Sequence, residues 1–359
     1  MQEERKELAL LKPVVSFLCG ASALVLTALT PVQASSPRAS TSFNAAGSTF
    51  AQPFLQKAFA AYQSKYGVSV NYQGIGSGGG IKALTAKTVD FAVSDVPMNP
   101  TTELPAAEKA GGTVEQIPVT LGGVAIAYNL SGVKSGQLHL TGAVLAQIYL
   151  GTIKKWNDKQ IKALNKRVKL PNQAIVVVHR SDGSGTSYIF TDYLSRVSDQ
   201  WRGVVGVNKL PNWPTGVGGP GNPGVAQLVQ STPGAIGYVE LAYVLQNHMK
   251  YAMVENRSHV YLQPSLRTVA ADAAQFKKVS ATSFSIVNGP GKDSYPICGY
   301  SWLMVFKDQT ADSAKGKALV KLLNWTVTTG QKYAAKISYV PLPSNVQKVG
   351  ASAIKKIAT

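Results

Sequence analysis

Cysteine and negative charge are both scarce in this chain, and each shortage excludes classes of protein. Cysteine occurs 2 times in 359 residues, as Cys19 and Cys298, which is too few for a disulfide framework. The 4 histidines show no metal-ligand spacing, and no zinc or haem motif is present. Asp and Glu number 18 against 36 Lys and Arg, but no run of basic residues exceeds two. Scattered charge of this kind favours a solvated surface over a face that binds nucleic acid.

An uncharged apolar stretch, residues 13–30, lies near the N-terminus behind a segment that contains basic residues. Val-Gln-Ala at 32–34 places small residues at both recognition positions of a secretory cleavage site. The pattern predicts a signal peptide over 1–34, with a membrane anchor as the alternative. The serine-rich segment 35–42 is predicted to be disordered. Removal of the signal leaves Cys298, which lies in an apolar run and is predicted to be an inert buried thiol.

Strand and helix patterns alternate from residue 43 onward. Apolar positions repeat at helical spacing after Pro53, and Gly67 ends that pattern. The repetition predicts an α/β fold with parallel strands and with ligand loops at their carboxyl ends. In chain order the first elements are a strand over 43–47, a helix from 53, a strand over 68–72, a glycine-rich turn over 74–80, a helix from 81 and a strand over 89–94.

Two long apolar segments, 119–128 and 296–306, are predicted to be strands that cross between domains. They divide the chain into a discontinuous first lobe, 43–120 plus 296–350, and a second lobe, 121–295. Two crossing strands would form a hinge. The other predicted elements are helices over 141–150, 156–164, 187–197, 270–279 and 313–329, strands over 174–179 and 235–239, a helix ending at 247 and a loop over 212–224.

Residues 180–187, Arg-Ser-Asp-Gly-Ser-Gly-Thr-Ser, suit a bound oxyanion. The glycines let backbone N–H groups come close, and Ser184 and Thr186 add hydroxyl donors. The helix that follows points its positive end at the same place. Arg180 supplies a planar fork of charged donors, and Asp182 would orient that fork or cap the helix. A plain glycine-rich turn is the alternative.

Two further turns carry small hydroxyl residues before a helix. Residues 47–50, Gly-Ser-Thr-Phe, cap the next helix or donate to an anion through Thr49. Residues 74–80 follow a strand and contain a dinucleotide-like glycine spacing. An anion cradle around Ser77 fits better, because the glycines follow the second strand rather than the first. A serine hydrolase is disfavoured because Ser77 and Ser184 both lack the first glycine of a nucleophile elbow.

Asp95 ends a predicted strand, where a cap or a turn is the plain interpretation of its role. If Asp95 faces a bound oxyanion, its carboxylate repels every anion that has no proton to donate. Hydrogen phosphate carries a proton at neutral pH, and sulfate does not. A buried clash of this kind can cost several kcal/mol, which predicts selection of phosphate over sulfate.

Several segments occur in the order and spacing of one known family. The sequence resembles the phosphate-binding proteins of the high-affinity phosphate ABC transporter, the PstS family, over roughly residues 43–345. The segments are 46–50 (Ala-Gly-Ser-Thr-Phe), 72–77 (Tyr-Gln-Gly-Ile-Gly-Ser), 89–97 (Val-Asp-Phe-Ala-Val-Ser-Asp-Val-Pro), 153–156 (Ile-Lys-Lys-Trp), 180–187 and 233–240 (Pro-Gly-Ala-Ile-Gly-Tyr-Val-Glu).

The resemblance implies a periplasmic-binding-protein fold of type II, in which two α/β lobes close on one dehydrated phosphate. Asp182 would pair with Arg180. Ser48 stands where relatives often have alanine, and its role is open. The residues that the resemblance implies as phosphate ligands are Thr49, Phe50 (through its N–H), Ser77 and Asp95 in the first lobe, and Arg180, Ser184, Gly185 (through its N–H) and Thr186 in the second.

The resemblance also implies a receptor rather than an enzyme, with no cofactor and no metal. It would pass inorganic phosphate to the membrane permease and ATPase subunits of an ABC transporter. A periplasmic monomer with no nucleic-acid partner is expected. Three alternatives stay open: a secreted serine-dependent phosphatase-like hydrolase, a receptor for another oxyanion such as sulfate or tungstate, and an adhesion protein that uses its basic surface.

Overall fold

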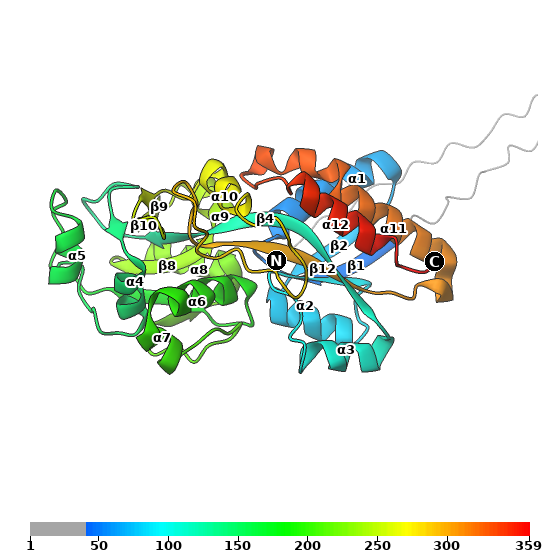
Figure 1. Cartoon of the computed structure of the whole chain (residues 1–359), viewed down its shortest axis with the longest axis horizontal. Helices are drawn as coiled ribbons and strands as arrows, with labels where there is room; N and C mark the ends of the chain where they lie inside the picture. The colour runs from blue at the N-terminus through cyan, green and yellow to red at the C-terminus, as the bar shows by residue number, and fades with distance from the viewer. Residues whose placement is uncertain (1–40) are drawn as a thin grey trace, which may run out of the picture. The chain divides into compact units, whose positions relative to one another are not determined.

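Residues 41–359 are the part of the chain that the computed structural model describes (Figure 1). The predicted signal peptide over 1–34 lies outside the described residues, as does most of the segment 35–42. Ser42, the last residue of that segment, is the first residue of a strand. Among residues 41–359, no helix is both long enough and apolar enough to cross a membrane.

Strands and helices alternate through the first part of the described chain, as predicted. The helix that the sequence predicts from Pro53 begins one residue earlier, at Gln52. It is capped by Gly67, whose left-handed backbone lets its N–H donate a hydrogen bond to Gln63 O. In chain order these elements are β1 (Ser42–Gly47), α1 (Gln52–Tyr66), β2 (Ser69–Gly74), α2 (Gly76–Thr85), β3 (Phe91–Ser94), α3 (Glu103–Gly111) and β4 (Val114–Tyr128).

The middle of the chain forms a second α/β group, and the chain then returns to the first. The middle elements are β5 (His139–Leu140), α4 (Gly142–Tyr149), α5 (Lys159–Leu164), β6 (Val176–Arg180), α6 (Gly185–Val197), α7 (Asp199–Val204), β7 (Val217–Gly219), α8 (Gly221–Ser231), β8 (Ala235–Glu240), α9 (Leu241–Gln246), β9 (Lys250–Tyr251), β10 (Met253–Glu255), β11 (Tyr261–Leu262) and α10 (Leu266–Ala273). The last elements are β12 (Cys298–Phe306), the 3₁₀ helices η1 (Thr310–Asp312), η2 (Thr329–Tyr333) and η3 (Ala335–Ile337), and the helices α11 (Ser313–Val327) and α12 (Ser344–Ile354).

A sheet of nine strands runs through the described residues in the order β2-β1-β3-β12-β4-β8-β6-β7, with β9 paired to β4. β1 pairs in parallel with β2 and β3, and β6 pairs in parallel with β7 and β8. We call the half built on β1–β3 the first lobe and the half built on β6–β8 the second lobe. The fold is therefore α/β with two lobes, as the sequence predicts.

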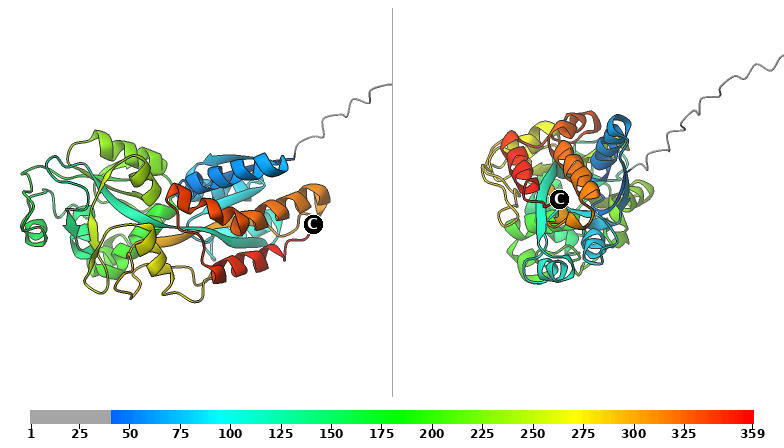
Figure 2. Two further views of the ribbon diagram at one scale, coloured as in Figure 1. Left: turned by 90° about the horizontal axis from the view of Figure 1, so that it is seen from above. Right: turned by 90° about the vertical axis from the view of Figure 1, so that its right-hand side faces the viewer.

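Two antiparallel strands, β4 and β12, join the lobes (Figure 1, Figure 2). The first part of β4 pairs with β12, and its last residues, Val124–Tyr128, pair with β8 of the second lobe. β12 also pairs with β3 of the first lobe through Trp302, Leu303 and Met304. All residues of β12 are buried, which explains its uninterrupted apolar sequence. Cys298, the first residue of β12, is a buried free thiol, as predicted.

Several regions differ from the elements that the sequence predicts. The predicted glycine-rich turn over 74–80 is largely helical, because α2 already begins at Gly76, whose positive φ of 79° suits glycine. The predicted loop 212–224 contains β7 and the start of α8. The predicted helix 270–279 is displaced to α10, because Ser265 and Thr268 form a capping box that starts the helix earlier. The predicted helix 156–164 starts only after Asp158, whose side chain accepts from Gln160 N–H as an N-cap.

Candidate functional site: a buried oxyanion site between two lobes

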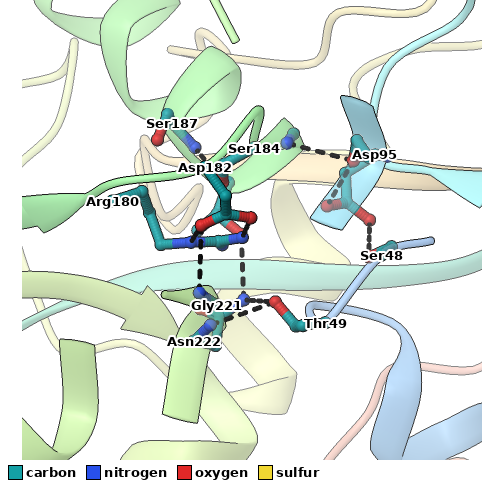
Figure 3. Close-up of polar contacts among 12 residues, drawn as sticks. Ser48, Thr49, Asp95, Arg180, Asp182, Ser184, Ser187, Gly221 and Asn222 are labelled. Atoms are coloured by element: carbon teal, nitrogen blue, oxygen red, sulfur yellow. Dashed lines mark hydrogen bonds and ion pairs between the residues drawn. The ribbon is translucent and has the colours of Figure 1, made fainter. Parts of the chain in front are cut away.

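The carboxyl ends of the parallel strands from both lobes meet beside the two joining strands (Figure 3). The turn after β1 carries Thr49, α2 after β2 carries Ser77, and Asp95 follows β3 directly. Arg180 ends β6 in the second lobe, and the N-terminus of α6 follows it. Side chains at these strand ends therefore share one place, which is where ligands bind in open α/β sheets.

Arg180 is a buried cation held by its own turn. Only 2% of the residue is exposed. Its Nε and Nη2 donate to the two carboxylate oxygens of Asp182, at 2.8 and 2.5 Å, and Nη1 lies 3.3 Å from Thr186 Oγ1. Asp182 also accepts from Gly221 N–H at 3.0 Å. Asp182 therefore orients the guanidinium instead of capping the helix, which was one of the two predicted roles.

The N-terminus of α6 supplies the other donors of the second lobe. Ser184 is the N-cap, and its Oγ accepts from Ser187 N–H at 3.0 Å. This bond leaves the hydroxyl proton of Ser184 free to donate to an anion. Thr186 and Gly185 occupy the first helical turn, where backbone N–H groups point outward and the helix dipole favours negative charge.

Hydrogen bonds cross directly from one lobe to the other at this place. Gly185 N–H donates to Ser77 Oγ at 3.0 Å, and Gly78 N–H donates to Gly183 O at 2.8 Å. A Cβ at Gly185 would lie 2.4 Å from Asp95 Cβ. Only glycine therefore permits this approach between the lobes.

Thr49 of the first lobe meets Asn222 of the second. Thr49 Oγ1 accepts from both the backbone N–H and the Nδ2 of Asn222, each at 3.0 Å. The same Nδ2 lies 3.1 Å from Thr186 Oγ1, so one amide connects hydroxyls of both lobes. A surface pocket of about 280 Å³ opens beside this contact, and it is lined by Thr49, Gly74, Ile75, Asp182, Pro220, Gly221 and Pro223.

Asp95 is the one carboxylate of the first lobe at this place among the described residues, and 3% of it is exposed. Its Oδ1 accepts from the hydroxyls of Ser48 and Ser301, and Ser77 Oγ lies 3.4 Å from its Oδ2. Burial raises the pKa of Asp95 to about 6, although these hydroxyls and the charge of Arg180 oppose the rise. Asp95 is therefore ionised at neutral pH.

A family model described as a PBP superfamily domain matches residues 32–328. The phosphate-binding protein PstS of Xylella fastidiosa is 42% identical over 311 residues, which cover 86% of this chain and 84% of the relative. The chain belongs to the PstS family. The PstS of Pasteurella multocida is 42% identical over 309 residues, which cover 85% of this chain and 88% of the relative.

Among solved structures, a high-affinity periplasmic phosphate-binding protein bound with phosphate is similar, with a TM-score of 0.68 at 21% identity. The match covers 87% of this chain and 93% of that chain. This likeness supports the two-lobed fold. The PstS resemblance seen in the sequence is thus confirmed by the family model and by the relatives.

Most residues predicted as ligands in this PstS-family chain lie together. Thr49, Ser77, Asp95, Arg180 and Thr186 are all buried, as are Ser184 and Gly185. The side chain of Phe50 belongs to the core, and its carbonyl accepts from Tyr339 OH at 2.5 Å. The role proposed for Phe50 belongs to its backbone N–H alone, so burial of the ring is consistent with it.

Sequence reasoning missed Asn222 and Ser301. Asn222 lies in the segment predicted as a Pro/Gly-rich loop, and the only signal there was Gly-Asn-Pro-Gly at 221–224, which is typical of a turn. Ser301 lies in an apolar strand, where a serine gives no functional signal by itself. Ser48 was noted without a role, and the structure shows its hydroxyl on Asp95.

The arrangement lacks the partners that a serine hydrolase needs. His179 is the histidine next to Arg180, but its ring stacks on Trp213 at 4.9 Å and its Nδ1 lies 3.0 Å from Arg180 O. It is therefore not placed as a base for Ser184. Within residues 41–359, no cluster of His, Cys, Asp or Glu could hold a metal ion.

A second buried carboxyl, Glu240, ends β8 near Asp95. Its Oε2 accepts from Ala242 N–H at 2.7 Å. Burial raises the pKa of Glu240 well above its ordinary value, and the nearby charge of Asp95 adds to the rise. Burial therefore favours the uncharged form of Glu240.

Proposed function

We propose that this chain is an extracytoplasmic phosphate receptor that delivers inorganic phosphate to an ABC transporter. The observation that carries the proposal is the meeting of donors from both lobes around one ionised carboxylate. Arg180, Thr186 and the Gly185 N–H come from the second lobe, and Thr49 and Ser77 come from the first. The phosphate-binding names of the PstS relatives support the same function.

Phosphate would exchange for the hydrogen bonds that now join the lobes. Ser77 Oγ would donate to a phosphate oxygen instead of to Asp95 Oδ2, the Gly185 N–H would donate to phosphate instead of to Ser77, and Asn222 would keep Thr49 and Thr186 in place. Each charge-assisted hydrogen bond is worth about 1.5–3 kcal/mol, and Arg180 adds the guanidinium N–H groups that its pair with Asp182 leaves free. These contacts are complete only when both lobes surround the ligand, so phosphate would favour the closed arrangement.

Asp95 would select the ligand rather than attract it. Its carboxylate can only accept hydrogen bonds while it is ionised, so one ligand oxygen must carry a proton. Hydrogen phosphate meets that requirement, and sulfate does not. A sulfate oxygen against Asp95 would leave two negative charges in contact in a buried site.

The proposal extends to the surroundings of the receptor. We place it in the periplasm as a monomer, and its partners would be the permease and ATPase subunits of the transporter. The lobe limits belong to the proposal as well: 43–120 plus 296–350 for the first lobe, and 121–295 for the second. β4 and β12, which join the lobes, lie at these limits.

Thermal unfolding of the purified protein with phosphate or sulfate tests the proposed function. At a phosphate concentration of about 100 times Kd, binding stabilises the protein by about 2.7 kcal/mol, so the midpoint should rise by several degrees. Sulfate at the same concentration should leave the midpoint unchanged. An equal rise with sulfate would favour a general oxyanion receptor, and no rise with phosphate would contradict the proposal.

An assay for phosphate-ester hydrolysis separates the receptor from the hydrolase alternative. The receptor should release no product from a chromogenic phosphate ester. Turnover that is lost in Ser184→Ala would instead establish the serine-dependent hydrolase.

A further inference from the structure

One carboxylate oxygen, Oδ1 of Asp95, accepts two serine hydroxyls from different parts of the fold. Ser48 lies in the turn after β1, and Ser301 lies in the joining strand β12. The Ser301 bond measures 2.7 Å. Both serines are fully buried, at 0% exposure. Two donors on Oδ1 hold the carboxylate group in one orientation. The other oxygen, Oδ2, is left for a different contact.

The backbone around Ser48 fixes the direction of its proton. Its N–H donates to Val93 O at 2.8 Å, and its Oγ accepts from Ala51 N–H at 2.9 Å. A hydroxyl has one proton to donate, and a lone pair of Ser48 Oγ already accepts from the Ala51 N–H. The proton of Ser48 is therefore left for Asp95.

An irregularity in the pairing of the two joining strands lies beside Ser301. Ser301 pairs with Thr120 and Trp302 pairs with Pro118, so the extra residue, Val119, belongs to β4. Such a bulge bends the paired strands locally, beside the residue whose hydroxyl reaches Asp95. Ser301 therefore connects the strand that joins the lobes to the carboxylate that faces the ligand.

The second oxygen of Asp95, Oδ2, faces the place where the lobes meet. Ser77 Oγ lies 3.4 Å from it, and a Cβ at Gly185 would lie 2.6 Å from it. Oδ2 is thus the oxygen that a ligand between the lobes would contact.

We propose that Ser48 and Ser301 are positioning residues for oxyanion selection, which act by holding Oδ1 and keeping Asp95 ionised. Oδ2 then stays a pure acceptor, and it meets only a ligand oxygen that carries a proton. This inference rests on the proposed function and names two residues that determine its specificity.

The charges around Asp95 make its protonation state depend on the serine hydroxyls. Burial raises the pKa of Asp95, while Ser48, Ser301, Arg180 and Ser77 lower it. Arg180 is already neutralised in part by Asp182. Burial raises the pKa of the other titratable groups that face Asp95 and so favours their uncharged forms: Tyr72, Glu240, Tyr243 and Tyr339. Loss of the two serine donors should therefore leave the carboxyl protonated up to higher pH.

A pH series of calorimetric titrations tests the inference. Phosphate and sulfate are titrated separately into wild type, Ser48→Ala, Ser301→Ala and the double variant, from about pH 5 to about pH 8. In wild type, rejection of sulfate should hold above the pKa of Asp95, about 6, and weaken below it. In the double variant this loss of selectivity should begin at least about one pH unit higher, because a protonated Asp95 can donate to sulfate. The single variant Ser301→Thr keeps a hydroxyl at this position, so its dependence of selectivity on pH should match that of wild type.

Ser94→Ala is the matched control. Ser94 is also a buried serine, one residue before Asp95, but its Oγ donates to Val96 O at 2.6 Å. This variant removes a buried hydroxyl without touching the carboxylate, so its pH profile should match that of wild type. A shift in Ser94→Ala as large as in the double variant would assign the effect to general loosening and overturn the inference.

The test separates the inference from the proposed function. If wild type binds phosphate and the double variant keeps the wild-type profile, the inference fails and the receptor function stands. If wild type itself binds no phosphate, the proposed function fails. Should the double variant not fold, the two single variants carry the test, each with an expected shift in the same direction and about half as large.

Discussion

Two buried charges face each other across the lobes, and their surroundings compensate them differently. Arg180 and Asp95 are almost equally buried, at 2% and 3% exposure. Arg180 has a carboxylate partner in Asp182, whereas the carboxylate of Asp95 has only hydroxyl partners at hydrogen-bond distance among the described residues. The ion pair with Asp182 holds the guanidinium of Arg180 in one orientation. The neutral hydroxyl donors hold the carboxylate of Asp95 without cancelling its negative charge. Under the proposed function, this difference would make Arg180 a source of affinity and Asp95 the residue that selects the ligand.

The largest expected effect comes from removing the cation. Arg180→Ala removes charged donors and leaves the carboxylate of Asp182, whose side chain is 24% exposed, without its cation. Because each hydrogen bond to a charged group is worth about 1.5–3 kcal/mol, phosphate affinity measured by calorimetry should fall by about two to three decades. Arg196→Ala is the control, because Arg196 pairs with Asp192 on the surface with 44% of its side chain exposed. Near-wild-type affinity in Arg180→Ala would remove Arg180 from the site.

The next effect concerns the buried carboxylate, Asp95, and the selection of the ligand. Asp95→Asn replaces an acceptor-only carboxylate by an amide that can donate to an unprotonated oxyanion. The ratio of phosphate to sulfate affinity should fall by about two decades, mainly because sulfate binds better. Competition of sulfate against phosphate measures the ratio. An unchanged preference would mean that Asp95 does not select the ligand.

A smaller effect tests whether the two lobes must close on each other for phosphate to bind. Gly78 lies where the lobes meet, and a Cβ there would be 3.1 Å from Gly183 Cα, on a backbone atom. Gly78→Ala should therefore hold the lobes slightly apart and weaken phosphate binding about tenfold. Gly79→Ala is the matched control, since its nearest neighbour is the side chain of Ile75, 45% exposed, in the same lobe. Equal affinities in the two variants would argue against closure at this point.

The last effect concerns the stability of the fold rather than ligand binding, and it uses a third buried carboxyl, Asp272. Burial raises its pKa to about 8, while Gly289 N–H and Cys298 lower it only in part. Among the described residues, Asp272 accepts from the Gly289 N–H and from no serine hydroxyl, whereas Asp95, whose pKa is about 6, has serine hydroxyls and the charge of Arg180 nearby. The comparison therefore contrasts a buried carboxyl that has such neighbours with one that lacks them.

The sign of this effect follows from linkage. A carboxyl whose pKa is higher in the folded state stabilises the protein fully below its unfolded pKa of about 3.9, and the contribution is lost as the pH rises through the folded value. The loss should be about 1.4 kcal/mol per pH unit until about pH 8. Denaturant unfolding of wild type and Asp272→Asn between about pH 6 and pH 8 checks this, because the variant should lose less stability. Parallel pH profiles would contradict the raised pKa of Asp272.

The sequence was informative where small residues and strand ends occur together. Arg180 to Thr186 and Ser77 were found because their glycine-rich turns carry hydroxyl residues between an apolar strand and a helix. Asp95 was found because it ends an apolar strand. The two joining strands were found because β4 and β12 are buried over nearly their whole length, which gives continuous apolar runs.

The rest depends on contacts between distant segments. Asn222 reaches Thr49 from 173 positions away, and Ser301 reaches Asp95 from 206 positions away. No local pattern encodes either pair. Ser301 also depends on a shift in strand register, and register follows from pairing with β4 rather than from the residues of β12 alone.

The most direct measurement is the ratio of phosphate to sulfate affinity of the wild-type protein at about pH 8, where Asp95 is ionised. The account predicts tight phosphate binding and no measurable heat with sulfate in the same calorimeter. Sulfate binding of comparable strength at that pH would contradict selection by an ionised Asp95.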